Sequence, residues 1–178
     1  MTEDETERNE VYVTDETKEI LGVTCIVVKD TVWDEDDELV EDTYDWYAQD
    51  KDGNVWYFGE DSKEYENGEV VSTKGSWESG VDGAKPGIIM EANPKVGNSY
   101  YQEYYEGEAE DMAEVISLGE PVSVPYDSFK NCLKTKEWTP LEPDIIANKY
   151  YAPGIGFVLE IMVEGGSERV ELLDIRTE

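Results

Sequence analysis

The sequence predicts an all-β protein, either an antiparallel β-barrel or a half-barrel, lipocalin-like, with at most one or two short helices. Two observations support this fold class. About nine or ten short runs of β-branched and aromatic residues alternate with turn residues along the chain. The 12 Tyr and 5 Trp residues can bury large areas, so a packed core is expected although 33% of the residues are charged.

The expected strands follow one another as hairpins. The clearest are rich in β-branched or aromatic residues: 20–33, 39–49, 55–60, 99–106, 156–163 and 169–175. Residues 50–54, Asp-Lys-Asp-Gly-Asn, predict a tight turn between two of these strands. Residues 78–97 are rich in Gly and Pro and predict a long ordered loop, whereas 109–118 form either a short helix or another strand.

Length and composition predict one folded domain. Residues 11–178 are expected to form a single antiparallel β domain, and residues 1–10 an acidic disordered tail. This tail lacks the basic and apolar regions of a signal peptide, and no run of about 18 apolar residues is present. The chain is therefore expected to be either cytosolic or a mature exported form, without membrane insertion.

The charge balance excludes several functional classes. The chain has 44 Asp and Glu residues against 14 Lys and Arg, a net charge of −30, and no His. Nucleic acids and anionic membranes both require clustered basic residues, so neither is an expected partner. Without His, nucleophile systems that use His and zinc sites that need imidazole are excluded. The acidity fits either a saline environment or an acidic extracellular protein.

Two cysteines, Cys25 and Cys132, leave two alternatives open. In an oxidising compartment they would form a disulfide that closes a long loop, worth about 4–5 kcal/mol in the chain-entropy model. The other alternative is a pair of buried thiols in strands.

The C-terminal stretch KYYAPGIGFVLEIMVEGGSERVELLDI, residues 149–175, resembles a pattern common in secreted bacterial proteins and lipoproteins. The blocks DWYAQDKDGNVWYFGED, GSWESGVDGAKPGIIM and YYQEYYEGEAED are similar to exported bacterial or archaeal proteins of unassigned function. This resemblance covers most of residues 20–175. It implies a lipocalin-like or half-barrel sheet and an extracytoplasmic location, secreted or at the cell surface, after signal removal. It implies no catalytic residue.

A first candidate metal site lies in the turn at 50–54. Asp50, Asp52 and Asn54 match the first three ligand positions of a calcium loop of the EF-hand type. The match then fails, because Val55 replaces the required Gly and Asp61 replaces the final Glu. A hairpin turn explains the same residues more simply, and calcium is the only cofactor that the sequence suggests.

A second candidate site follows from alternation along strands 39–49 and 55–61. If these strands pair across the turn, one face carries the aromatic residues expected to contact a ligand: Tyr44, Trp46, Trp56 and Phe58. Asp42 and Glu60 would lie on that face as a pair for cation binding or for acid/base catalysis. Alternatively, both lie at the barrel mouth and reach water or a Lys. A slip of one residue in register would separate them.

These features predict a non-enzymatic, extracytoplasmic binding module that holds a divalent cation or a small ligand at the mouth of a β-barrel. Two alternatives stay open. One is a carboxylate-based hydrolase acting on glycans, with Asp42 and Glu60 as the catalytic pair. The other is a structural or surface-assembly subunit whose charge keeps it soluble before assembly. The sequence leaves the oligomeric state open.

Overall fold

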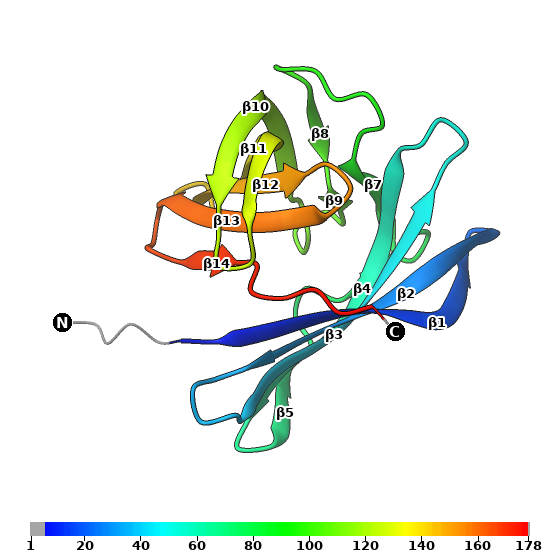
Figure 1. Ribbon diagram of the computed structural model, residues 1–178. Coiled ribbons are helices and arrows are strands. Elements are labelled where there is room, and N and C mark those ends of the chain that lie inside the picture. Colours follow the sequence, from blue (N-terminus) through cyan, green and yellow to red (C-terminus); the bar gives the residue numbers. More distant parts are fainter. Residues whose placement is uncertain (1–5, 178) are drawn as a thin grey trace. The chain divides into compact units, whose positions relative to one another are not determined.

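The computed structural model describes residues 6–177, and all regular secondary structure in this range is β-strand (Figure 1). Every strand pairing is antiparallel, so the predicted all-β antiparallel class is confirmed. Among the described residues, no helix has the length and apolar character needed to cross a membrane. Within the described residues, the chain predicted as one domain comprises two compact units. Unit 1 contains residues 6–91 together with Glu103–Ala109, and unit 2 contains Ala92–Gln102 together with residues 110–177.

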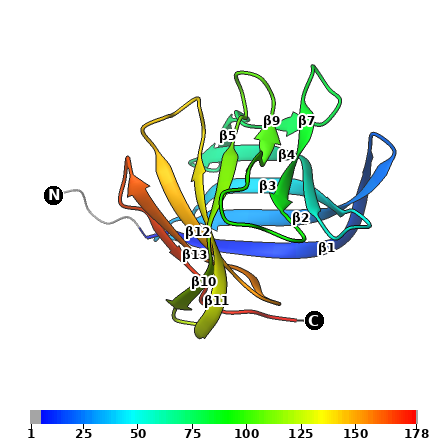
Figure 2. The same cartoon turned by 90° about the horizontal axis from the view of Figure 1, so that it is seen from above.

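Unit 1 contains an eight-stranded sheet. Its strands are β1 (Arg8–Ile20), β2 (Val23–Trp33), β3 (Leu39–Gln49), β4 (Val55–Glu66), β5 (Glu69–Ser72), β6 (Trp77–Glu78), β7 (Lys85–Met90) and β9 (Glu103–Tyr104). The main order is β1-β2-β3-β4-β7-β9, while β5 and β6 each pair with β4. Figure 2 shows β1 to β4 side by side, with β1 at the margin of this series.

Unit 2 contains a six-stranded sheet in the order β14-β13-β12-β11-β10-β8. Its strands are β8 (Ser99–Tyr101), β10 (Met112–Ser123), β11 (Ser128–Trp138), β12 (Ile146–Ala152), β13 (Gly156–Glu164) and β14 (Arg169–Glu171). Within residues 6–177 neither sheet closes on itself, because each ends in two different edge strands. This open arrangement is compatible with the half-barrel alternative and differs from a closed barrel.

Two predicted boundaries near the N-terminus are wrong. The single strand expected over residues 20–33 is interrupted by Leu21 and Gly22, whose φ angles of 52° and 77° form a tight turn between β1 and β2. The part of the predicted tail from Arg8 to Glu10 begins β1 instead. Residues 1–5 of that tail lie outside the described residues.

The structure of two central segments, 78–97 and 109–118, can also be compared with the sequence predictions. The predicted loop over residues 78–97 contains a strand, β7, which pairs with both β4 and β9. Residues 112–123 form strand β10, so the helix alternative for 109–118 is wrong. The paired partners explain both outcomes, because a neighbouring strand supplies backbone hydrogen bonds whatever the local propensity.

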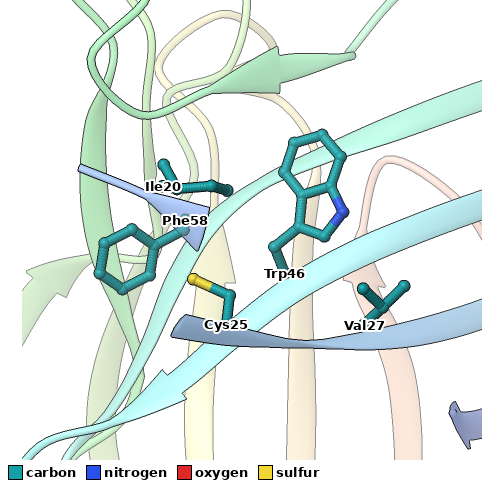
Figure 3. Close-up of a cluster of buried hydrophobic side chains, with 5 residues drawn as sticks. All are labelled: Ile20, Cys25, Val27, Trp46 and Phe58. Atoms are coloured by element: carbon teal, nitrogen blue, oxygen red, sulfur yellow. The ribbon is translucent and has the colours of Figure 1, made fainter. Parts of the chain in front are cut away.

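Each unit has its own apolar core. In unit 1 the core residues Ile20, Cys25, Val27, Trp46 and Phe58 are at most 7% exposed (Figure 3). In unit 2 the core contains Val122, Cys132, Ala152, Val158 and Leu159. Both cysteines are free and buried, the second of the two alternatives that the sequence left open.

A β-bulge in β4 decides which of its side chains face the core. Tyr47 pairs with Tyr57, but the next register pair is Asp45 with Glu60, so β4 contains one extra residue at this point. Gly59 lies in the bulge with a φ of 130°. Beyond Gly59, every side chain of β4 points to the face opposite the one that strict alternation predicts.

We expect Gly59→Ala to lower the free energy of unfolding by at least about 2 kcal/mol. A Cβ atom at this position would collide with the backbone oxygen of Trp77 and would lie 3.0 Å from Cα of Glu78. Its φ is also one that residues with a side chain rarely adopt. Urea unfolding measures the change, with Gly119→Ala in β10 as the control, because a Cβ there meets nothing within 4 Å. Equal effects of the two substitutions would contradict this account of the bulge.

Candidate functional site

The bulge places Asp42 and Glu60 on opposite faces of the β3–β4 hairpin. Asp42 pairs in register with Lys63, whereas Glu60 pairs with Asp45. Because side chains alternate along β3, Asp42 shares the face of Tyr44, and Asp45 points to the other face together with Glu60. The predicted pair of carboxylates on one shared face is therefore wrong, and the extra residue in β4 is the physical reason.

The four aromatic residues predicted to contact a ligand do share one face, but two of them are core residues. Trp46 and Phe58 are each 7% exposed, whereas Tyr44 and Trp56 are half-buried and pack against them. The ammonium nitrogen of Lys18 lies 3.2 Å from the ring centroid of Trp46. Of the four rings, those of Tyr44 and Trp56 remain accessible to a ligand.

Beside this core, a group that we name the Tyr44 patch surrounds the Tyr44 ring with charged side chains: Lys29, Asp42, Asp61 and Lys63. Lys29 and Asp61 are the register partners of Tyr44 in β2 and β4. Lys29 Nζ lies 3.0 Å from Asp42 Oδ1, and Lys63 Nζ lies 2.8 Å from Asp61 Oδ2. The two ammonium nitrogens are 5.5 Å and 6.0 Å from the centroid of the Tyr44 ring.

The charges of the Tyr44 patch balance one another. The hydrogen bond with Asp42 raises the pKa of Lys29, and the hydrogen bond with Asp61 raises the pKa of Lys63, in both cases against a smaller opposing effect of burial. Both lysines therefore stay charged and are matched by two aspartates, in a chain whose net charge is −30. An aromatic ring with four charged hydrogen-bonding groups can bind a ligand that has both an apolar face and hydroxyl groups.

The predicted calcium ligands form a hydrogen-bonded hairpin turn. Asp50 Oδ1 accepts hydrogen bonds from the backbone N–H groups of Asp52 and Asn54, each at 2.9 Å. Asp50 Oδ2 accepts from Asn54 Nδ2 at 2.8 Å and from the Trp56 indole at 2.9 Å. The Trp56 and Asn54 side chains lower the pKa of Asp50 to about 2.

Residues 6–177 contain no group of three or more Asp, Glu or Cys side chains arranged to hold a metal ion. The Asp50 carboxylate is used by the turn, and the Asp42 carboxylate is used by Lys29 and by the Thr31 hydroxyl at 3.2 Å. Calcium binding at Asp50, Asp52 and Asn54 stays a prediction, whereas Asp42 and Glu60 point to opposite faces of the hairpin and cannot share one ion.

On the opposite face of the hairpin, Asp45 and Glu60 share one phenol, an arrangement that the sequence did not predict. The Tyr57 hydroxyl oxygen lies 2.5 Å from Asp45 Oδ1 and 3.0 Å from Glu60 Oε2. Asp45 is 8% exposed and Tyr57 is 3% exposed. The hydroxyl has one proton and can donate to only one carboxylate at a time, so a proton retained by Asp45 would complete the network.

Aromatic rings enclose this phenol. The Tyr57 ring stacks on Tyr47 at a centroid distance of 4.7 Å and meets Trp77 edge-on at 5.4 Å. Burial raises the pKa of Asp45 to about 6, against the hydrogen bond from Tyr57 and with further increases from Asp30 and Glu41. Burial also raises the pKa of Tyr57 well above its usual value. Asp45, Tyr57 and Glu60 form a polar cluster inside unit 1.

Unit 2 contains a second buried polar cluster, centred on Glu137, which is 8% exposed. Glu137 Oε1 accepts hydrogen bonds from the hydroxyls of Thr135 at 2.7 Å and Tyr151 at 3.1 Å. Lys149 Nζ lies 3.1 Å from Glu137 and 3.9 Å from Glu160. Burial lowers the pKa of Lys149, but the two glutamates raise it by more. The sequence contains a signal for this cluster: polar residues stand at alternate positions in two consecutive strands, at 135 and 137 in one and at 149 and 151 in the next.

Comparison with known proteins establishes no family. No protein-family model matches the sequence, and no curated protein matches it. A solved structure of a candidate exported protein with a YmcC-like fold, from Bacteroides fragilis, is similar over 90% of this chain and 87% of that chain, with 15% sequence identity and a TM-score of 0.41. A likeness this remote determines neither the family nor the activity of the chain.

The raised pKa of Asp45 predicts a specific dependence of stability on pH. Asp45 keeps its proton up to about pH 6 in the folded protein but loses it near 3.8 in the unfolded chain. The folded state therefore binds the extra proton between these values, and the contribution of Asp45 to stability falls by about 3 kcal/mol as the pH rises through this window.

We expect Asp45→Asn to match the wild type in stability near pH 3.5 and to gain up to about 3 kcal/mol relative to it by pH 7. Denaturant unfolding across this range measures the difference, with Asp36→Asn in an exposed loop as the control. A constant difference between Asp45→Asn and the wild type would show that Asp45 ionises normally.

Proposed function

We propose that the protein is a non-enzymatic binding module that contacts a saccharide through the Tyr44 patch. The observation that supports this is the half-buried Tyr44 ring between two lysine–aspartate pairs on one sheet face. The ring would stack on the apolar face of a sugar, and the four charged groups would hydrogen-bond to its hydroxyls. Sheet strands hold all five side chains, so binding would need little ordering of the protein.

A neutral ligand suits the Tyr44 patch better than a metal ion. Each aspartate already has an ammonium group within 3.0 Å, so a cation would have to displace a lysine from it. An anion would meet the two carboxylates and the negative potential of the whole chain. A neutral saccharide avoids both conflicts, because its hydroxyls can donate to the carboxylates and accept from the ammonium groups.

The hydrolase alternative loses its predicted catalytic pair, because Asp42 and Glu60 lie on opposite faces. Asp45 and Glu60 do lie together, but around a phenol that is 3% exposed. An open depression of about 440 Å³ in unit 1 is lined by Glu38, Leu39, Asn67 and Gly68, and it contains no member of this carboxylate pair. The geometry therefore favours binding over hydrolysis.

An extracytoplasmic location remains part of the proposal. It is supported by the resemblance of residues 149–175 to secreted bacterial proteins. A saccharide ligand agrees with this location, because cell surfaces and their surroundings are rich in glycans.

Titration calorimetry with cellohexaose, xylohexaose, maltohexaose and chitohexaose tests the proposal. We expect at least one of these sugars to bind, and Tyr44→Ala to weaken that binding at least about tenfold because the stacking surface is lost. Asp42→Asn keeps the side-chain shape and should weaken binding through the loss of a charged acceptor. Tyr126→Ala, a Tyr of 39% exposure in unit 2, is the matched control and should leave binding unchanged.

Three results would contradict the proposal. The first is the absence of binding by all four sugars at millimolar concentration, and the second is equal loss of binding in Tyr44→Ala and Tyr126→Ala. The third is release of shorter sugars during incubation, which would indicate a hydrolase. In a parallel titration, a melting temperature that rises with calcium concentration would favour the cation alternative instead.

A further inference from the structure

Among residues 6–177, the first strand of unit 1 is a long edge that pairs on one side only. β1 spans 13 residues and pairs with β2. The other described strands that pair with a single neighbour, β5, β6, β8, β9 and β14, have between two and four residues each. Short edges resist the addition of another strand, whereas a long edge offers a row of backbone donors and acceptors to an extended peptide.

The regular part of this edge lies at residues 8–13, before the β1–β2 register shifts between Val13 and Thr17. Within it, Val11, Tyr12 and Val13 are 62%, 52% and 64% exposed, although they are large apolar or aromatic residues. Val11 and Val13 point to one face of the sheet and Tyr12 to the other. An added strand could therefore cover apolar surface on both faces.

The charges along β1 select the chemistry of the added strand. β1 contains four acidic residues and two basic ones, Arg8 and Lys18. Arg8 is engaged with Glu10, Asp37 and the Trp33 ring, and Lys18 with Glu78 and the Trp46 ring. Residues 8–13 carry one basic and one acidic residue, so the preference for a basic strand comes from Asp15, Glu16 and Glu19 further along β1 and from the net charge of −30.

We propose that residues 8–13 of β1 bind an extended basic segment of another protein as an additional antiparallel strand. In this segment Lys or Arg alternates with apolar residues. Its apolar side chains lie beside Val11 and Val13, and its basic side chains lie on the face of Glu10 and Tyr12. A second copy of this chain is a poorer occupant, because two chains of charge −30 repel each other.

A fluorescent peptide of alternating Lys and Val, blocked at both ends, tests this interaction by anisotropy with the full-length protein. We expect saturable binding that weakens as salt is added. The double variant Val11→Lys/Val13→Lys should bind at least about tenfold more weakly, because it loses apolar contact and places like charges against the peptide. Val70→Lys/Val71→Lys in β5 makes the same change of charge at residues that are 49% and 52% exposed, and it should have a much smaller effect.

Two further measurements separate strand addition from simple attraction of opposite charges. A peptide with N-methyl groups on alternate residues keeps its charge but cannot pair along its whole length, so it should bind much more weakly. Hydrogen exchange of the amides in residues 8–13 should slow when the unmodified peptide binds.

Equal binding of the methylated and unmodified peptides would overturn the proposal. So would equal losses in the two double variants, or slowed exchange confined to another strand. If the protein alone formed dimers that Val11→Lys/Val13→Lys dissociated, the occupant of the edge would be a second copy and the proposed partner would be wrong.

Discussion

Strand β4 cannot follow a single alternation from end to end, because Gly59 holds one extra residue in a bulge against β6. Before the bulge, Phe58 reaches the apolar core. After it, Lys63 joins Tyr44 on the core side, while Glu60 turns toward Tyr57. With a strict two-residue period, Lys63 would point to the polar face and the Glu60 carboxylate would point to the core. The bulge thus allows Phe58 to point to the apolar core and Glu60, only two residues later, to point to the polar face.

The few lysines and arginines of this acidic chain take part in many of its contacts with aromatic rings and carboxylates. At least seven of the 14 basic side chains in the chain lie over aromatic rings. Several of these seven also pair with carboxylates, as Lys29 does with Asp42 and Lys63 with Asp61. A basic side chain that contacts both an aromatic ring and a carboxylate links two neighbouring groups, whereas a solvated surface lysine links none. The rest of the surface is left acidic, which favours solubility and selects for neutral or basic partners.

The all-β class, the hairpin around Asp50 and the shared aromatic face of Tyr44 and Trp46 were predictable, because turn chemistry and two-residue periodicity are local properties. The separation of Asp42 from Glu60 was not predictable in the same way. It depends on Gly59 fitting against the backbone of β6, a strand that lies almost twenty residues further along the chain. The polar clusters likewise depend on residues brought together from several strands, and no single run of sequence contains them.

The Tyr44 patch and the β1 edge belong to one row of the sheet. Tyr12 of β1 pairs with Lys29, Lys29 pairs with Tyr44, and Tyr44 pairs with Asp61. All four side chains point to the same face, because residues paired directly across an antiparallel sheet share a face. A strand added beyond Tyr12 would lengthen this row and restrict the position of Tyr12 against Lys29. Lys29 is also the residue whose ammonium group pairs with Asp42 beside Tyr44, so a single residue of β2 separates Tyr12 from Tyr44 in this row.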